Sequence, residues 1–139
     1  MITGECFCAR VTYEVDGTLC NARSCHCSRC RKAFSGASSA YAEMSPDATF
    51  SWLTQETLAT YETGEGWAIG FCSHCGSTLC GLWNGEVHGL TLGCVNGDPG
   101  VEIEYHLFVG SRAPWEHIGG TAPQFAEHPE SAEAKSTEV

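Results

Sequence analysis

The chain has 139 residues, of which 42% are hydrophobic, and its 17 acidic and 7 basic residues give a formal net charge of −10. This length predicts one domain, and the acidic balance argues against general nucleic-acid binding, which needs a basic surface. No hydrophobic run reaches membrane-spanning length and the first residues do not resemble a signal peptide, so we expect a cytoplasmic protein without a membrane partner. In that compartment the ten cysteines are expected as metal-bound thiolates rather than disulfides.

Short strands separated by turn signals are predicted along most of the chain. Residues 18–24 have no clear period, and residues 31–34 predict one short helical turn. Asn84-Gly85 is a strong hairpin signal between two of the strands. The predicted strands cover residues 11–15, 38–44, 49–53, 57–62, 67–71, 77–83, 87–95 and 102–109.

The absence of a long helical period favours an all-β, antiparallel fold. We expect one zinc-binding domain over residues 1–125. Residues 126–139 contain several glutamates and little hydrophobic content, so they predict a disordered acidic tail.

Three cysteines lie within six residues in the segment Cys25-His26-Cys27-Ser28-Arg29-Cys30. If residues 25–27 are extended, Cys25 and Cys27 share a face and His26 points away. The turn to Cys30 brings a third sulfur to the same point, and three converging thiolates suit zinc. Three protein ligands leave one position of a tetrahedral ion open, which is typical of a catalytic site.

The three cysteines also fit roles other than an open metal site. A distant fourth ligand, Cys20, Cys80 or Cys94, would close the group into a structural site. The thiols could also form disulfides, or Cys27 and Cys30 could work as a redox pair.

A second set of cysteines is split between two distant segments. Cys6 and Cys8 share a face if their segment is a strand, and Cys72 and Cys75 form a knuckle followed by Gly76. Two pairs provide the four ligands of a closed structural zinc site. The sequence therefore predicts a metal clip between the start and the middle of the chain.

Basic residues gather around the three-cysteine segment. No Asp or Glu occurs from Gly17 to Ala42, while Arg23, Arg29, Arg31 and Lys32 lie in this window. These cations offset the charge of a three-thiolate centre, and they could also attract an anionic substrate. Arg29, Arg31 and Lys32 are the predicted substrate contacts.

The chain resembles the glutathione-dependent formaldehyde-activating enzyme family, which includes centromere protein V. The resemblance rests on Gly4-x-Cys6-x-Cys8, Cys25-His26-Cys27-x-x-Cys30, Phe71-Cys72-x-x-Cys75-Gly76 and Ser111-Arg112-Ala113-Pro114-Trp115. It implies a β-tent of several small antiparallel sheets, similar to methionine-R-sulfoxide reductases. One departure is Ala9, which stands where the family usually has glycine.

The resemblance also implies two zinc ions. A structural zinc would bind Cys6, Cys8, Cys72 and Cys75, and a catalytic zinc would bind Cys25, Cys27 and Cys30. The expected activity is that of a zinc-dependent carbon–sulfur lyase acting on the adduct of a small anionic thiol, as in the joining of glutathione and formaldehyde. The alternative is a non-catalytic, zinc-stabilised binding module of the same family.

Overall fold

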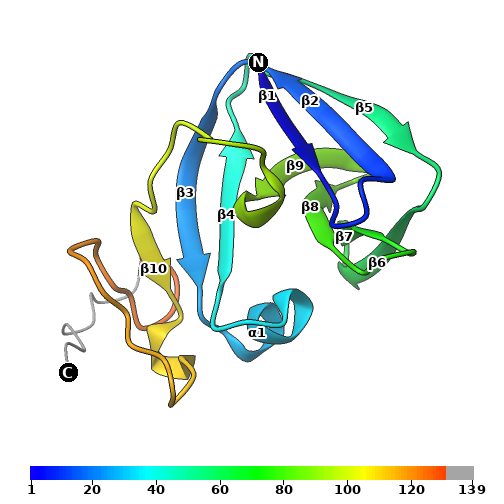
Figure 1. Cartoon of the computed structure of the whole chain (residues 1–139). Coiled ribbons are helices and arrows are strands. Elements are labelled where there is room, and N and C mark those ends of the chain that lie inside the picture. Colours follow the sequence, from blue (N-terminus) through cyan, green and yellow to red (C-terminus); the bar gives the residue numbers. More distant parts are fainter. Residues whose placement is uncertain (131–139) are drawn as a thin grey trace. The chain divides into compact units, whose positions relative to one another are not determined.

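The computed structural model describes residues 1–130, which form mostly strands and one short α-helix (Figure 1). This confirms the all-β class that was predicted from the turn signals. Within these residues, no helix has the length and hydrophobicity needed to cross a membrane.

The chain divides into two compact units, each built from two separate segments. Unit 1 contains Met1–Cys20 and Tyr41–Val101, and unit 2 contains Asn21–Ala40 and Glu102–Val139. The strands β3 (Leu19–Cys25) and β4 (Ser39–Met44) each begin in one unit and end in the other. The predicted domain over residues 1–125 therefore includes segments of both units.

The first sheet of unit 1 has the order β1-β2-β5, with all neighbours antiparallel. Burial alternates along its central strand, as the sequence predicted. Val11, Tyr13 and Val15 are fully buried, while the residues between them are not. The Tyr13 ring fills the space that a side chain at Gly4 would need. The strands are β1 (Ile2–Glu5), β2 (Val11–Asp16) and β5 (Thr49–Gln55).

The second sheet of unit 1 has the order β4-β9-β8-β7-β6. Asn84 and Gly85 both have positive φ, at 48° and 83°, which is the backbone of the predicted two-residue hairpin turn. The strand expected over 87–95 ends at Thr91, and Leu92–Cys94 form a 3-10 turn instead. The remaining strands are β6 (Leu58–Gly64), β7 (Trp67–Cys72), β8 (Thr78–Trp83) and β9 (Glu86–Thr91).

Unit 2 contains most of β3, the helix α1 (Ser28–Phe34) and the strand β10 (Tyr105–Leu107). β10 pairs with β3 in parallel, which the expectation of a purely antiparallel fold did not include. β10 is much shorter than the predicted strand 102–109, because Phe108 adopts φ of 54° and begins a 3-10 turn. The 3-10 turn covers Val109–Ser111.

Hydrogen bonds extend the described structure into the segment that was predicted to be a tail. The carbonyl of Ala126 accepts from the Gly110 N–H at 3.3 Å, and the carbonyl of Glu127 accepts from the Phe108 N–H at 2.7 Å. Residues 131–139 of the predicted tail lie outside the described residues.

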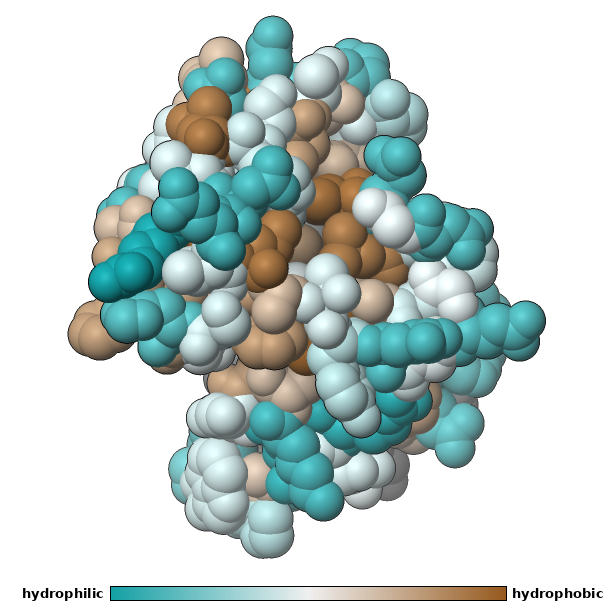
Figure 2. Space-filling model, turned by 90° about the vertical axis from the view of Figure 1, so that its right-hand side faces the viewer, coloured by the Kyte–Doolittle hydropathy of each residue, from teal (hydrophilic) through white to brown (hydrophobic). Residues whose placement is uncertain are grey.

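Several large hydrophobic side chains are exposed on unit 1. Figure 2 faces the side that carries β5, and it shows hydrophobic residues gathered between hydrophilic ones. The large exposed hydrophobic residues of unit 1 include Leu53, Tyr61, Trp67 and Trp83.

Candidate functional site

The sulfur atoms of Cys6, Cys8, Cys72 and Cys75 converge in unit 1, all within 4.8 Å of one another. The Cys8 Sγ lies 3.6 Å from Cys6 Sγ and 3.7 Å from Cys72 Sγ. Four sulfurs held about 2.3 Å from a zinc ion at tetrahedral angles would lie about 3.8 Å apart. The spacing and the all-thiol donor set therefore fit a closed tetrahedral metal site.

Two tight turns present these four thiols. The β1–β2 turn is closed by the Ala9 N–H, which donates to the Cys6 carbonyl, and the second turn by the Gly76 N–H, which donates to the Cys72 carbonyl. Ser77 links the turns, because its Oγ accepts from the Phe7 N–H at 2.9 Å. The local backbone thus holds the two cysteine pairs together.

Hydrogen bonds tune the ionisation of this group. Desolvation opposes ionisation of Cys75, but hydrogen bonds from the side chain and backbone of Ser77 outweigh it and lower the pKa of that thiol to about 5. Desolvation also opposes ionisation of Cys72, and the Thr57 hydroxyl helps to lower its pKa. Desolvation raises the pKa of Cys8 to about 11. At neutral pH the group thus holds both thiolates and thiols, and metal binding would release the remaining protons.

The sulfur atoms of Cys25, Cys27 and Cys30 converge in unit 2, again within 4.8 Å of one another. Cys25 ends β3 and Cys27 caps the N-terminus of α1, where its Sγ accepts from the Cys30 N–H at 3.3 Å. No other Cys, His, Asp or Glu of residues 1–130 belongs to this group. The strand-to-helix turn therefore brings together the three thiols of the Cys25–Cys30 segment.

Cys25 and Cys30 shift each other's pKa in opposite directions. The hydrogen bond from Cys25 lowers the pKa of Cys30 to about 6, and the same contact raises the pKa of Cys25. Hydrogen bonds from Cys27 and Ser39 and the positive charge of Arg29 also favour the Cys30 thiolate. At neutral pH at least one sulfur of the group is ready to bind a soft or borderline cation.

His26 does not belong to the thiol group, although it lies between two of its cysteines in the sequence. Its Nε2 is hydrogen-bonded to His106 Nδ1 at 3.0 Å, and the His26 residue is 3% exposed. Burial, followed by the nearby His106 and Arg112, lowers the pKa of His26 to about 4. At neutral pH His26 is therefore an uncharged support of the turn.

The three predicted substrate contacts all lie on α1, but their surroundings differ. Arg29 and Lys32 are exposed, whereas Arg31 is half-buried and its Nε has no hydrogen-bond partner within residues 1–130. A buried donor without a partner is costly, so an anion that reached Arg31 would meet an unsatisfied group. Among the three, Arg31 is the residue most suited to a carboxylate.

Ser39 is a residue of this site that sequence reasoning missed. It is 5% exposed, and its Oγ accepts from the Cys25 N–H at 3.3 Å besides favouring the Cys30 thiolate. Nothing in the local sequence distinguishes it from Ser35 or Ser38. Only the path of β4 brings it to the thiols, so no sequence signal could have identified it.

The remaining cysteines belong to neither group. All ten cysteines are free thiols, so the structure contains no disulfide cluster. Cys80 is buried in the core of unit 1, where desolvation raises the pKa of its thiol to about 12. Cys94 donates to the Thr78 carbonyl at 3.4 Å. Cys20, Cys80 and Cys94 therefore do not supply the distant fourth ligand that the sequence left open.

Two comparisons with known proteins find similar chains. Residues 1–111 match the family model described as glutathione-dependent formaldehyde-activating enzyme. A crystal structure of a Rhodobacter sphaeroides protein is 30% identical, with a TM-score of 0.53 over 69% of this chain and 89% of that chain. No curated protein matches. The match to more than half of the chain shows that it belongs to the glutathione-dependent formaldehyde-activating enzyme family.

Proposed function

We propose that this protein is a zinc-dependent carbon–sulfur lyase that makes or breaks the adduct of a small anionic thiol and an aldehyde. The family supports glutathione and formaldehyde as the reference pair. The observation that carries the proposal is the group of three converging thiols, Cys25, Cys27 and Cys30, which no fourth ligand from residues 1–130 closes. Cys6, Cys8, Cys72 and Cys75 would hold a second, structural zinc.

Cys25, Cys27 and Cys30 would hold the metal beside the place where the substrate thiol binds. A zinc ion bound there supplies positive charge that favours the ionised form of the substrate thiol. The substrate sulfur then attacks the carbonyl carbon, a C–S bond forms, and the carbonyl oxygen takes up the proton that the thiol has lost. In the reverse direction the hydroxyl proton leaves, the C–S bond breaks, and thiol and aldehyde are released.

The residues around the thiols hold this arrangement in place. The Cys30 N–H fixes the Cys27 sulfur, and the Ser39 hydroxyl fixes the backbone of Cys25. Arg29, Arg31 and Lys32 would meet the carboxylates of the substrate. These groups would restrict the orientation of the substrate sulfur before the reaction. Holding reacting atoms in a productive orientation accelerates a reaction.

Turnover with glutathione and formaldehyde tests the reaction directly. We expect the zinc-loaded protein to form S-(hydroxymethyl)glutathione faster than the uncatalysed mixture, as measured by exchange NMR. Cys30→Ser should abolish the acceleration, while Cys20→Ser, which alters a cysteine outside both groups, should leave it unchanged. No acceleration by the fully zinc-loaded protein with any small thiol would overturn the enzymatic proposal.

Binding of anionic and neutral thiols tests the proposed role of Arg31. A shielded charge-assisted contact is worth roughly 1.5–3 kcal/mol, so Arg31→Glu should weaken glutathione binding by about 10- to 100-fold. Binding of 2-mercaptoethanol should change little. Arg10→Glu makes the same charge change in unit 1 and serves as the control. If Arg31→Glu weakened the binding of both thiols equally, the basic residues would serve only to balance the negative charge of the cysteine thiolates.

A binding module without catalysis is the second candidate. It is favoured by the surroundings of two side chains that could transfer a proton: His26 is buried and hydrogen-bonded to His106, and the Tyr41 hydroxyl is hydrogen-bonded to His88. Thiol binding at full metal occupancy without any turnover would select this candidate.

A further inference from the structure

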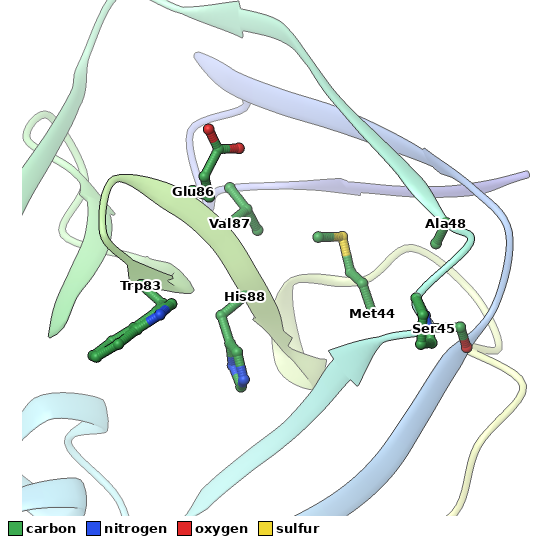
Figure 3. A pocket seen from close by; sticks show the side chains of 8 residues that line it. Met44, Ser45, Ala48, Trp83, Glu86, Val87 and His88 are labelled. Carbon is green, nitrogen blue, oxygen red and sulfur yellow. The ribbon is translucent and has the colours of Figure 1, made fainter. Parts of the chain in front are cut away.

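A pocket of about 290 Å³ opens on unit 1, and neither cysteine group contributes to it (Figure 3). Figure 3 shows Trp83 and His88 side by side on one wall, with Met44 and Ala48 across from them. Five of its eight lining residues are apolar and three are polar, so it offers both kinds of contact to a small molecule. The lining residues are Met44, Ser45, Pro46, Ala48, Trp83, Glu86, Val87 and His88.

A chain of hydrogen bonds fixes His88 in the wall. Its Nδ1 lies 2.8 Å from the Tyr41 hydroxyl and its Nε2 lies 3.3 Å from Glu43 Oε1. Both ring nitrogens therefore have partners, and His88 presents its ring to the pocket rather than a free donor. The only hydroxyl of the lining, on Ser45, is hydrogen-bonded to Thr18 at 2.8 Å.

The backbone of β8 and β9 is shaped for this arrangement. The partners of Gly81 and Leu82 are Gly89 and Val87, so His88 is the extra residue of a β-bulge, a device that re-aims a side chain. A Cβ at Gly81 or Gly89 would lie 2.6 Å or 2.5 Å from the Tyr41 hydroxyl oxygen. The two glycines thus leave the space in which Tyr41 reaches His88.

Aromatic rings surround His88 and remain partly exposed. The Trp67 and Trp83 ring centroids lie 4.6 Å apart, and Trp67 meets the His88 ring edge-to-face at 5.1 Å and 84°. Trp67 and Trp83 are 41% and 43% exposed, although indole rings are usually buried more deeply. Tryptophan is the best aromatic partner of an organic cation, and Trp83 belongs to the pocket lining.

The charge of unit 1 also favours a cation. Ten of the 17 acidic residues lie in this unit, against a single basic residue, Arg10. Glu86 belongs to the lining, and Glu43 lies behind His88. Field lines of one sign concentrate in a pocket with apolar walls, so cations are attracted and anions repelled.

We propose that this pocket binds a small organic cation with an apolar body, of the quaternary alkylammonium class, against Trp83 and His88. The apolar part of the ligand would contact Met44 and Val87, and the carboxylates of Glu43 and Glu86 would supply attraction at longer range. This site is separate from the thiol chemistry proposed above and does not depend on it.

Three probes of nearly equal shape but different charge test whether the pocket prefers a cation. They are choline, its neutral carbon analogue 3,3-dimethylbutan-1-ol, and the anionic 3,3-dimethylbutanoate. Titration of the zinc-loaded protein should show choline binding about tenfold more tightly than the alcohol, and the anion more weakly than both. Equal binding of choline and the alcohol, or tighter binding of the anion, would overturn the proposal.

The two methionines locate the bound probe without any substitution. Met44 lines the pocket, while Met1 is exposed at 76% and does not belong to the lining. With ¹³C-methyl methionine, the Met44 signal should shift during choline titration and the Met1 signal should not. An unchanged Met44 signal at saturating choline would mean that any binding occurs elsewhere and would contradict the proposal.

Variants then assign the contacts. Trp83→Leu should weaken choline binding about tenfold and Trp83→Phe less, while Trp115→Leu, in unit 2, should have no effect. Glu86→Gln should weaken choline binding about threefold, with Glu56→Gln as the control outside the lining. Unchanged choline affinity in folded Trp83→Leu, as judged by circular dichroism, would also overturn the assignment.

Discussion

Ala9 adopts a left-handed backbone with φ of 65°, in the turn that presents Cys6 and Cys8. A side chain is disfavoured there by roughly 1–2 kcal/mol, whereas glycine is not. The residue that departs from the family's usual glycine therefore carries local strain in the four-thiol site. Because Ala9 is exposed, its methyl group contributes little packing to offset that strain.

Ala9→Gly should stabilise the protein. The relief of strain exceeds the extra entropy that glycine gives the unfolded chain, so the expected net gain is about 0.5–1 kcal/mol. Urea denaturation at fixed zinc concentration measures it, and Ala37→Gly, at a position without positive φ, should instead be neutral or destabilising. A loss of stability in Ala9→Gly would show that the turn does not have this conformation.

The His26–His106 pair should make stability depend on pH. Burial lowers the pKa of both residues, that of His26 to about 4, so the unfolded state binds more protons between about pH 6.5 and 4. Stability from the neutral pair is therefore present above about pH 6.5 and is lost as the pH falls toward 4.

His106→Gln tests this dependence, since it keeps a hydrogen-bonding side chain and removes one titrating group. The wild-type protein should lose about 1–2 kcal/mol more than the variant between pH 6.5 and 4.5, after allowance for partial solvation. The free energy of unfolding is measured at each pH for both proteins. Metal loss affects both equally, so it cancels in their difference. Parallel curves would contradict the depressed pKa of the pair.

At the scale of elements, the close packing of β4 against β9 depends on Gly89. A Cβ there would lie 2.5 Å from the Ala42 carbonyl oxygen, a backbone atom that cannot easily move. Gly89→Ala should therefore destabilise unit 1 by about 1–3 kcal/mol. Gly93→Ala, where a Cβ meets nothing within 4 Å, is the matched control for thermal melts. Equal melting temperatures would disprove the close approach.

The two cysteine groups should respond differently to the same substitution. Cys72 is fully buried in the clip between the β1–β2 turn and the end of β7, so Cys72→Ser should cost more than about 4 kcal/mol. Cys30→Ser should leave a folded chain that has lost the second metal. Circular dichroism melts distinguish the variants, and unfolding of Cys30→Ser with native-like stability of Cys72→Ser would reverse the assigned roles.

The accuracy of sequence reasoning differed among the elements for identifiable reasons. Asn84-Gly85 and the alternation of residues 11–15 carry their own turn and strand chemistry, so those elements were predicted. β3 was missed because its burial does not alternate regularly and Asn21 has positive φ. The parallel β3–β10 pairing depends on contacts between distant segments, which no local pattern encodes.

The two cysteine groups were predicted because each ligand pair has its own spacing in the sequence. Ser39 and His106, which support the three thiols, have no such pattern and reach the site only through the paths of β4 and β10. The pocket beside His88 was missed for the same reason: its residues come from β4, β8, β9 and the connection after β4.

At the scale of the whole molecule, charge is divided unequally along the chain. Six of the seven basic residues belong to unit 2, which contains the three-thiol group. Glutathione binding should therefore weaken with salt, since exposed charges are screened beyond about 8 Å at physiological ionic strength. Calorimetric titration from about 0.05 to 0.5 M salt measures this, with 2-mercaptoethanol as the salt-insensitive control. Salt-independent glutathione binding would contradict the attraction.

Zinc content per chain tests the central claim most directly. Two separate thiol groups predict two zinc ions in freshly purified protein, with the three-cysteine site losing its ion first to a chelator because it has fewer protein ligands. Elemental analysis should give two ions per chain for the wild-type protein and one for Cys30→Ser. Wild-type protein that binds no zinc, even after addition of the ion to fully reduced thiols, would contradict the account.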